Sequence, residues 1–160
     1  ELVAYEDGAI PSGCSLPMGS LSLFSKFVDG LFPTKEERKA IESTVKSELE
    51  RAKTAGLKCK HLTGVGGTIR AAKLCNDLSG ADPDNRMIPA EEIRRLYKGL
   101  KKGDKHTLQQ ILRSTPDRVH TILPGLIILT TVMDAYGVET VSVSTCGVRE
   151  GYLLDRVMKE

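Results

Sequence analysis

The sequence lacks the features that mark several large classes of protein, beginning with a hydrophobic run long enough to cross a membrane. Its longest apolar run, residues 122–133, is interrupted by Pro124 and Gly125 and is far short of the ~20 residues that span a bilayer. The first residues also lack the basic segment followed by an apolar core that marks a secretory signal. We therefore expect a soluble, cytoplasmic protein with no membrane association.

Cysteine motifs and an excess of one charge are also missing. The four cysteines, at positions 14, 59, 75 and 146, form no C-x-x-C pair and have no histidine at zinc-finger spacing, so we expect no zinc site. A chain of this size can bury ~70% of its unfolded surface without disulfides, which favours reduced thiols. With 23 Lys+Arg against 21 Asp+Glu, the formal charge is only +2, so any anion site must be local.

What is present is the composition of one folded domain: 160 residues, 40% of them hydrophobic and 28% charged. Apolar residues 2–5, the turn pair Asp7-Gly8 and the alternating residues 10–18 predict an antiparallel hairpin. Because the chain begins directly on strand-like residues, we expect that residue 1 is a cut and that a strand before it is missing.

Helical periodicity dominates the remainder of the chain. Thr34 and Glu37 have the spacing of a capping box, and apolar residues then recur at helical intervals from Ile41 until Gly56. Further helices are predicted over residues 20–29, after Thr68 as the N-cap, from Pro89 to Leu100, around residues 108–112, over residues 119–136 with a kink near Pro124, and from Gly147 onward. Two more strands are predicted over residues 59–65 and 138–143, and a loop over residues 79–86.

This order of elements predicts an α/β fold with a mixed sheet flanked by helices. Two strands run directly into helices, at residues 64–68 and at residues 144–151. Ligands of open α/β sheets bind at the carboxyl ends of the strands. If the two strands are parallel neighbours, both junctions therefore lie on one rim of the sheet, and a functional site is expected there.

The first junction is a glycine loop. Gly64, Gly66 and Gly67 lack Cβ atoms just before Thr68, so backbone N–H groups and a helix N-terminus can approach an anion or nucleotide closely. The loop has neither the Lys-Ser/Thr ending of a P-loop nor the G-x-G-x-x-G spacing of a dinucleotide fold. The alternative interpretation is a tight turn that only allows the helix to pack on the sheet.

The second junction, residues 144–151, places hydroxyls, a thiol, a guanidinium and a carboxylate within eight residues of a strand end. Arg149 could hold a phosphate in a bidentate fork, and Glu150 could orient it or accept a hydrogen bond from a ribose. Alternatively, both side chains pair with structural neighbours and fix the last helix to the sheet. Cys146 is a weaker candidate for a nucleophile, because no histidine lies near it in the sequence.

Other polar residues are interpreted as structural. The three histidines are isolated in the sequence, and none is a site candidate. The basic stretch from Lys98 to His106 is typical of a solvated helix end, and is kept only as a weak secondary contact for a long phosphate chain. Asp82, Asp84 and Asn85 resemble half of a calcium loop that lacks its glycine and its distant glutamate, so we expect them to form turns.

Three segments carry a resemblance to a known family: the glycine loop, PDRVHTILPGLIIL at residues 116–129, and VSTCGVREGYLL at residues 143–154. Together they resemble the exopolyphosphatase and guanosine pentaphosphate phosphohydrolase (Ppx/GppA) family. Gly-Val-Arg-Glu-Gly is the most specific part, although Thr145 and Cys146 depart from the commoner residues there. Upstream, ELVAYEDG and SLPMGS are similar to the stretch that follows the second phosphate loop of this family, D-I-G-G-G-S-T, so the resemblance covers nearly the whole chain.

The resemblance implies an actin-like, ribonuclease-H-like fold of two domains with the active site in the cleft between them. It also implies magnesium-dependent removal of terminal phosphates from inorganic polyphosphate or guanosine pentaphosphate. Residues 1–160 would form the second domain only, without its first strand, and the N-terminal domain of the same protein would be their partner. The resemblance makes Glu1 the candidate catalytic residue, because it matches the acid that closes the second phosphate loop. The candidate phosphate-binding or nucleotide-binding residues are Gly64, Gly66, Gly67, Thr68 and Arg149. No metal ligand is assigned.

Two further expectations follow from the resemblance. The first phosphate loop and the glutamate that activates water would lie in the first domain, so this chain alone should not hydrolyse phosphates. An open sheet edge left by the missing strand favours a homodimer. The competing interpretation is a non-hydrolysing actin-like domain that binds guanosine penta- or tetraphosphate or a regulatory partner. Actin-like sugar kinases and ATPases fit less well, because the Arg-Glu-Gly ending and the SLPMGS segment do not suit them.

Overall fold

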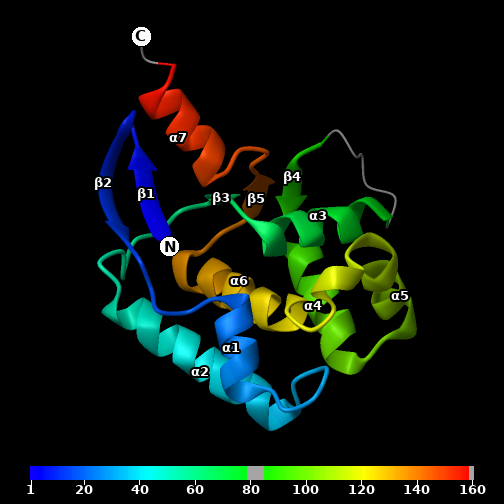
Figure 1. Ribbon diagram of the computed structural model, residues 1–160. Helices are drawn as coiled ribbons and strands as arrows, with labels where there is room; N and C mark the ends of the chain where they lie inside the picture. Colours follow the sequence, from blue (N-terminus) through cyan, green and yellow to red (C-terminus); the bar gives the residue numbers. More distant parts are fainter. Residues whose placement is uncertain (79–84, 159–160) are drawn as a thin grey trace.

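The computed structural model describes residues 1–78 and 85–158. Its strands are β1 (Leu2–Glu6), β2 (Ala9–Cys14), β3 (His61–Gly64), β4 (Met87–Pro89) and β5 (Thr140–Val143). Its helices are α1 (Ser20–Phe27), α2 (Lys35–Arg51), α3 (Gly67–Leu78), α4 (Ala90–Lys102), α5 (Lys105–Ser114), α6 (Ile122–Tyr136) and α7 (Val148–Arg156), with a short 3-10 helix, η1, at Pro116–Arg118. Figure 1 shows the β1–β2 hairpin and α7 on one side of the molecule and α4 and α5 on the other.

The predicted N-terminal hairpin is confirmed. β1 pairs with β2 in antiparallel register, with Leu2 opposite Cys14. Asp7 and Gly8 both have positive φ, 48° and 83°, as a tight turn between right-twisted strands requires. Among the described residues, however, the hairpin forms its own two-stranded sheet rather than joining the other strands. β1 and β3 therefore each keep an edge that pairs with no described strand.

The second sheet has the order β3-β5-β4, with β3 parallel and β4 antiparallel to the central strand β5. A mixed sheet is confirmed, but its antiparallel strand is β4, which was not predicted, and the hairpin is not part of it. β4 was missed because it has only three residues, and it ends at Pro89, where the sequence predicted a helix to begin; α4 instead begins at Ala90. Of the predicted loop, residues 79–84, including Asp82 and Asp84, lie outside the described residues, whereas the side chain of Asn85 accepts a hydrogen bond from the N–H of Met87, as a turn former does.

Helix α6 is the centre of the core and packs against α1, α2 and α4 (Figure 1). It begins at Ile122 rather than at residue 119, because η1 and a turn occupy the preceding residues. Pro124 consequently lies in the first helical turn, where a missing N–H breaks no intrahelical bond. The kink predicted near Pro124 was therefore wrong, since it assumed that the helix had already begun.

The predicted capping box of α2 is confirmed, because the Thr34 hydroxyl accepts a bond from the Glu37 N–H at 3.3 Å and the Glu37 carboxylate accepts one from the Thr34 N–H at 2.6 Å. α2 ends at Arg51, before the predicted stop at Gly56, and buries Ile41, Val45 and Leu49.

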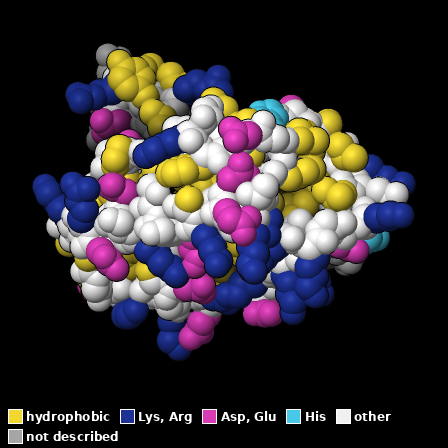
Figure 2. All heavy atoms as spheres, turned by 90° about the horizontal axis from the view of Figure 1, so that it is seen from below, with side chains coloured by type: hydrophobic (Ala, Val, Ile, Leu, Met, Phe, Trp, Pro, Cys, Tyr) yellow, Lys and Arg dark blue, Asp and Glu magenta, His cyan; other side chains and the backbone are white. Residues whose placement is uncertain are grey.

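Figure 2 shows acidic and basic side chains interspersed over the face seen from below. On this face, neither sign of charge forms a continuous field.

Within the described part of the chain, no helix is both long and apolar enough to cross a bilayer. All four cysteines are free thiols, and Cys75 is buried.

The uncovered face of the β3–β5 pair carries a hydroxyl network around His61, whose ring nitrogens lie 3.0 Å from the Thr140 hydroxyl and 3.1 Å from the Ser142 hydroxyl. These bonds give His61 a structural role on the sheet.

Candidate functional site

The two strand-to-helix junctions meet, as the sequence predicted. β3 and β5 are parallel neighbours, with Gly64 opposite Val143. Beyond the last pair, the N–H of Ser144 donates a hydrogen bond to the carbonyl of Gly64 at 2.9 Å. The glycine loop and the segment before α7 therefore leave the same rim of the sheet side by side, which is where α/β folds bind ligands.

Each of the three glycines of the first junction has a different structural role. A Cβ at Gly64 would overlap the buried side chain of Ile69, so at this position the tight packing of α3 on the sheet requires glycine. Gly66 has φ of +120°, a conformation that few residues other than glycine adopt. A Cβ at Gly67 would overlap the guanidinium of Arg118. The packing interpretation of the loop thus holds for Gly64, while Gly67 allows an arginine to approach the start of α3.

Thr68 is not the N-cap of α3, contrary to the sequence prediction. The helix begins at Gly67, two residues earlier than a cap at Thr68 would allow, because the carbonyl of Gly66 already accepts the first helical bond, from the N–H of Arg70 at 3.3 Å. The Thr68 side chain instead packs against α6, where a Cβ at Gly125 would lie 2.6 Å from the Thr68 hydroxyl oxygen. The backbone N–H groups of the first helical turn have no intrahelical acceptor, and this leaves them as donors for an anion.

Arg118 belongs to the rim but was missed by the sequence analysis. It lies 51 positions after Gly67, and η1 directs its guanidinium onto the start of α3. Its side chain is 38% exposed, and the nearest carboxylate oxygen, of Asp117, is 3.8 Å away. The only sequence signal for this contact is the glycine at position 67, which does not say which side chain occupies the space.

Arg149 and Glu150 separate into two roles. The Glu150 carboxylate accepts a hydrogen bond from the Gly147 N–H at 2.6 Å and so closes the N-terminus of α7. This bond lowers the pKa of Glu150, and the charges of Arg149 and Arg70 lower it further. Arg149 is exposed and makes no ion pair or hydrogen bond with the described residues. The structural interpretation therefore suits Glu150, and Arg149 keeps its guanidinium open to solvent.

The other polar groups of the second junction hold the loop in shape. The Ser144 hydroxyl donates to the Cys146 carbonyl at 2.8 Å and accepts from the Cys146 N–H at 3.1 Å. The Cys146 thiol is exposed, and its only bond described here is to the Thr145 hydroxyl at 3.9 Å. Without a histidine or another base bonded to it, Cys146 lacks the partner that activates a nucleophilic thiol.

Glu1 is exposed at the start of the hairpin, and no hydrogen bond or ion pair joins it to the rim. The structure thus brings together Gly64, Gly66, Gly67, Thr68 and Arg149, but its contacts do not connect Glu1 to them. The basic stretch kept as a secondary contact spans the connection of α4 to α5, and no described bond joins it to the rim either.

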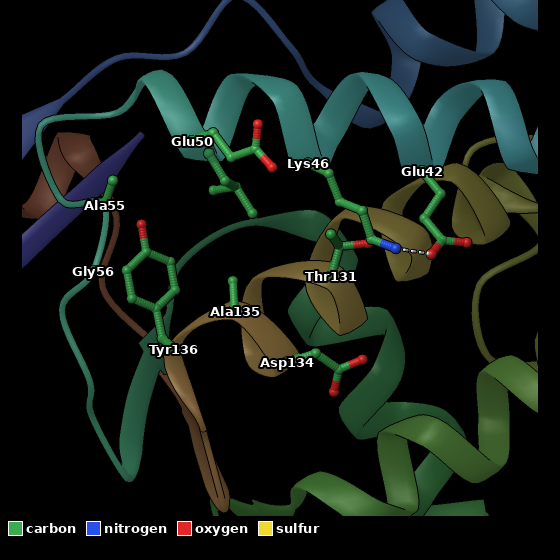
Figure 3. A pocket seen from close by; sticks show the side chains of 10 residues that line it. Glu42, Lys46, Glu50, Ala55, Gly56, Thr131, Asp134, Ala135 and Tyr136 are labelled. Atoms are coloured by element: carbon green, nitrogen blue, oxygen red, sulfur yellow. Dashed lines mark hydrogen bonds and ion pairs between the residues drawn. The ribbon is translucent and has the colours of Figure 1, made fainter.

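A groove lies elsewhere, between α2 and α6 (Figure 3). It has a volume of about 440 Å³ and is lined by Glu42, Glu50, Asp134, Lys46 and Tyr136, among others. Lys46 is already paired with Glu42 at 2.7 Å. Tyr136 precedes the amino end of β5, so this groove is at the opposite end of that strand from Ser144. Three carboxylates make it unsuited to a phosphate.

The groups that the rim exposes suit an anion better than a cation. The start of α3 offers backbone N–H donors and the exposed charged groups are guanidinium groups, none of which coordinates a metal ion, while the Glu150 carboxylate is held by the Gly147 N–H. Across the described ranges, no group of three or more His, Cys, Asp or Glu side chains is placed to hold a metal. Magnesium therefore does not fit the residues of this rim.

Comparison with solved structures identifies the fold. A Ppx/GppA family member from Aquifex aeolicus superimposes with a TM-score of 0.79 at 23% identity, over 98% of this chain and 52% of the other. An exopolyphosphatase from Cytophaga hutchinsonii ATCC 33406 gives a TM-score of 0.79 at 16% identity, over 95% of this chain and 51% of the other. The predicted ribonuclease-H-like (actin-like) α/β fold is confirmed.

The chain spans about half the length of these solved structures. A comparison with curated proteins gave no match. The model of the Ppx/GppA phosphatase family, in contrast, matches residues 1–160, which is every residue of the sequence. On this evidence, the chain belongs to the Ppx/GppA phosphatase family.

Proposed function

We propose that this chain is the second, cleft-forming half of a phosphohydrolase that removes terminal phosphates from inorganic polyphosphate or guanosine pentaphosphate. The observation that carries the proposal is the meeting of the two junctions, joined by the bond between Ser144 and Gly64. It places the start of α3 and the start of α7 at one rim, with Arg118 and Arg149 beside them. This arrangement suits a polyanion and is found in a member of a phosphatase family.

The chemistry explains what this half contributes. Phosphoryl transfer depends on positioning the phosphate and neutralising its charge more than on covalent assistance. The N–H groups of the first turn of α3 and the guanidinium groups of Arg118 and Arg149 bind and orient phosphate oxygens. Among the described residues of the rim, Glu150 is the one carboxylate that bonds to the rim, and it is engaged as a helix cap. The base that activates water is therefore assigned to the other half of the protein.

Two features support a partner half for this chain. β1 and β3 each have an edge without a described partner strand, which supports a further strand from outside these residues. No residue of α7 is buried, and Tyr152, Leu153 and Leu154 are all more than half exposed. Exposed apolar side chains on a helix that buries none of its residues favour a protein contact. We assign this surface to the N-terminal domain of the same protein, with a homodimer as the alternative occupant.

Glu1 and magnesium belong to the intact protein in this proposal. Glu1 would act at the cleft only once the segment before it is ordered by the other half. A magnesium ion would have its ligands among phosphate oxygens and the residues of that half, because the rim described above has none for it. The cytoplasmic location stays a proposal, with which the four free thiols agree.

A second function has its own support. The described rim has anion donors but no base, which is also what a non-hydrolysing domain that binds guanosine penta- or tetraphosphate would show. The two functions differ in turnover, since the regulatory domain would bind the nucleotide and release no phosphate even as part of the intact protein.

The test is phosphate release by the intact protein from polyphosphate and from guanosine pentaphosphate, with magnesium. Wild type should release phosphate, and R149A should lower kcat/KM at least tenfold because one charge-assisted bond is lost. The matched control is R51A, which removes an exposed arginine from the end of α2, away from the rim. Binding without release by wild type would favour the regulatory function, and equal rates in R149A and R51A would contradict the assignment of the site.

A further inference from the structure

Four arginines from four separate segments surround the rim. Arg118 lies on η1 against Gly67, and Arg70 lies one turn further into α3, where its charge acts on Glu150. Arg149 is in the first turn of α7. The fourth, Arg86, directly precedes β4, and its carbonyl accepts a hydrogen bond from the Val143 N–H at 3.0 Å. Because β4 runs antiparallel to β5, the start of β4 lies at the carboxyl end of β5, which is the rim.

Arg86 reaches the second junction with its side chain. Its guanidinium donates a hydrogen bond to the Thr145 hydroxyl at 3.5 Å, a long and weak contact. It makes no ion pair with any described carboxylate, and its side chain is exposed. The Glu150 carboxylate, which lies within the junction, is held by the Gly147 N–H. An unneutralised guanidinium beside a strand-end loop is therefore available to an anionic ligand.

The position of Arg86 differs from that of the other three arginines. The glycine loop follows β3, whereas Arg86 precedes β4, and β5 lies between these strands. Neighbouring strands are ~4.8 Å apart, so the two sides of the rim are separated by about 10 Å. This separation is between the backbones, and several linked phosphates span it, whereas one orthophosphate bound at the start of α3 does not.

We propose that Arg86 binds a further phosphate of a linear phosphate chain, beyond the phosphate held at the start of α3. The inference rests on the proposed function and narrows its substrate class to chains of linked phosphates that cross the rim from the glycine loop, past residues 144–147, to Arg86. The exposed Arg86 is then a specificity-determining residue: it adds affinity for long chains and none for a single phosphate.

The experiment measures binding of orthophosphate and of long-chain polyphosphate to the intact protein by calorimetry, over a range of salt concentrations. R86A should bind long-chain polyphosphate about tenfold more weakly, as expected for one lost charge-assisted bond. Its slope of log affinity against log salt should fall by about one, as for one lost phosphate contact. Orthophosphate affinity should not change. R51A, which also removes one exposed positive charge, should leave all three quantities as in wild type.

The outcomes separate this inference from the function on which it rests. If wild type binds polyphosphate and R149A weakens it, but R86A behaves as R51A does, the role of Arg86 is wrong and the proposed function stands. If R86A weakens orthophosphate and polyphosphate equally, Arg86 belongs to the first phosphate and not to a further one. If wild type binds neither ligand, both are wrong. R86K, which keeps the charge but loses the fork, should retain the salt slope and part of the affinity.

Discussion

At the scale of single residues, the rim depends on two glycines, Gly64 and Gly67, whose lack of a side chain leaves room for a neighbouring residue. Gly64 and Gly67 are three positions apart, yet they leave room for opposite kinds of neighbour. A Cβ at Gly64 meets the buried Ile69, which is packed on all sides, while a Cβ at Gly67 meets the far end of the flexible, partly exposed Arg118. Gly64 is therefore required by the packing of the core, and Gly67 leaves room for Arg118 at the proposed site.

This difference predicts two separate effects of the same substitution. Gly64→Ala should lower the free energy of unfolding by about 1–3 kcal/mol, the usual cost of overpacking a core. Gly67→Ala should leave stability nearly unchanged, because Arg118 can move into solvent, but should weaken polyphosphate binding. Urea denaturation and calorimetry of both variants would check this. A destabilised Gly67→Ala with unchanged affinity would show that Arg118 has a packing role only.

At the scale of elements, local signals predicted well those segments whose structure is decided by their own residues. The capping box at Thr34 and Glu37 and the Asp7-Gly8 turn are such cases, since each is closed by bonds between near neighbours. The start of α6 was misplaced because η1 precedes it, and β4 was missed because its three residues are ordered only by pairing with β5. For the same reason Arg86 and Arg118 could not be found, since only the tertiary fold brings them to the rim.

The start of α2 gives a prediction about pH. Hydrogen bonds from the Thr34 N–H and then from the Asp29 N–H lower the pKa of Glu37 below its ordinary value of 4.5. A carboxyl group with a depressed folded-state pKa stabilises the protein above its unfolded pKa, and this stability is lost as pH falls through the folded value. Wild type should therefore lose stability below about pH 4.5 more steeply than E37Q does. Parallel curves for the two proteins in acid denaturation would rule out this contribution.

At the scale of the whole molecule, the chain has a complete helical core but incomplete surfaces at the hairpin and at α7. Ile41, Val45, Leu126 and Met133 are fully buried, whereas no residue of α7 is. A core of this kind holds β3, α3 and β5 in place, and so preorganises the rim before any partner arrives. The unpaired edges of β1 and β3 and the exposed apolar side chains of α7 lie outside that core and suit a contact with a second structure.

These surfaces predict the behaviour of the chain when it is produced alone. The 160-residue chain should self-associate at high concentration, because its exposed apolar groups then cover one another. Replacing Tyr152 and Leu154 with serine should reduce this association without loss of helical structure, since neither side chain is buried. Replacing the exposed Leu112 of α5 with serine is the matched control and should have little effect. Light scattering would check this, and a wild-type chain that stays monomeric throughout would contradict it.

The measurement that tests the account most directly compares the 160-residue chain with the intact protein for polyphosphate binding and magnesium-dependent phosphate release. The account predicts that the chain binds polyphosphate, with a contribution from Arg149, and releases no phosphate above background, while the intact protein releases it. Sustained phosphate release by the chain alone, abolished by R149A, would show that these residues hold a whole active site and would contradict the division of the cleft between two halves.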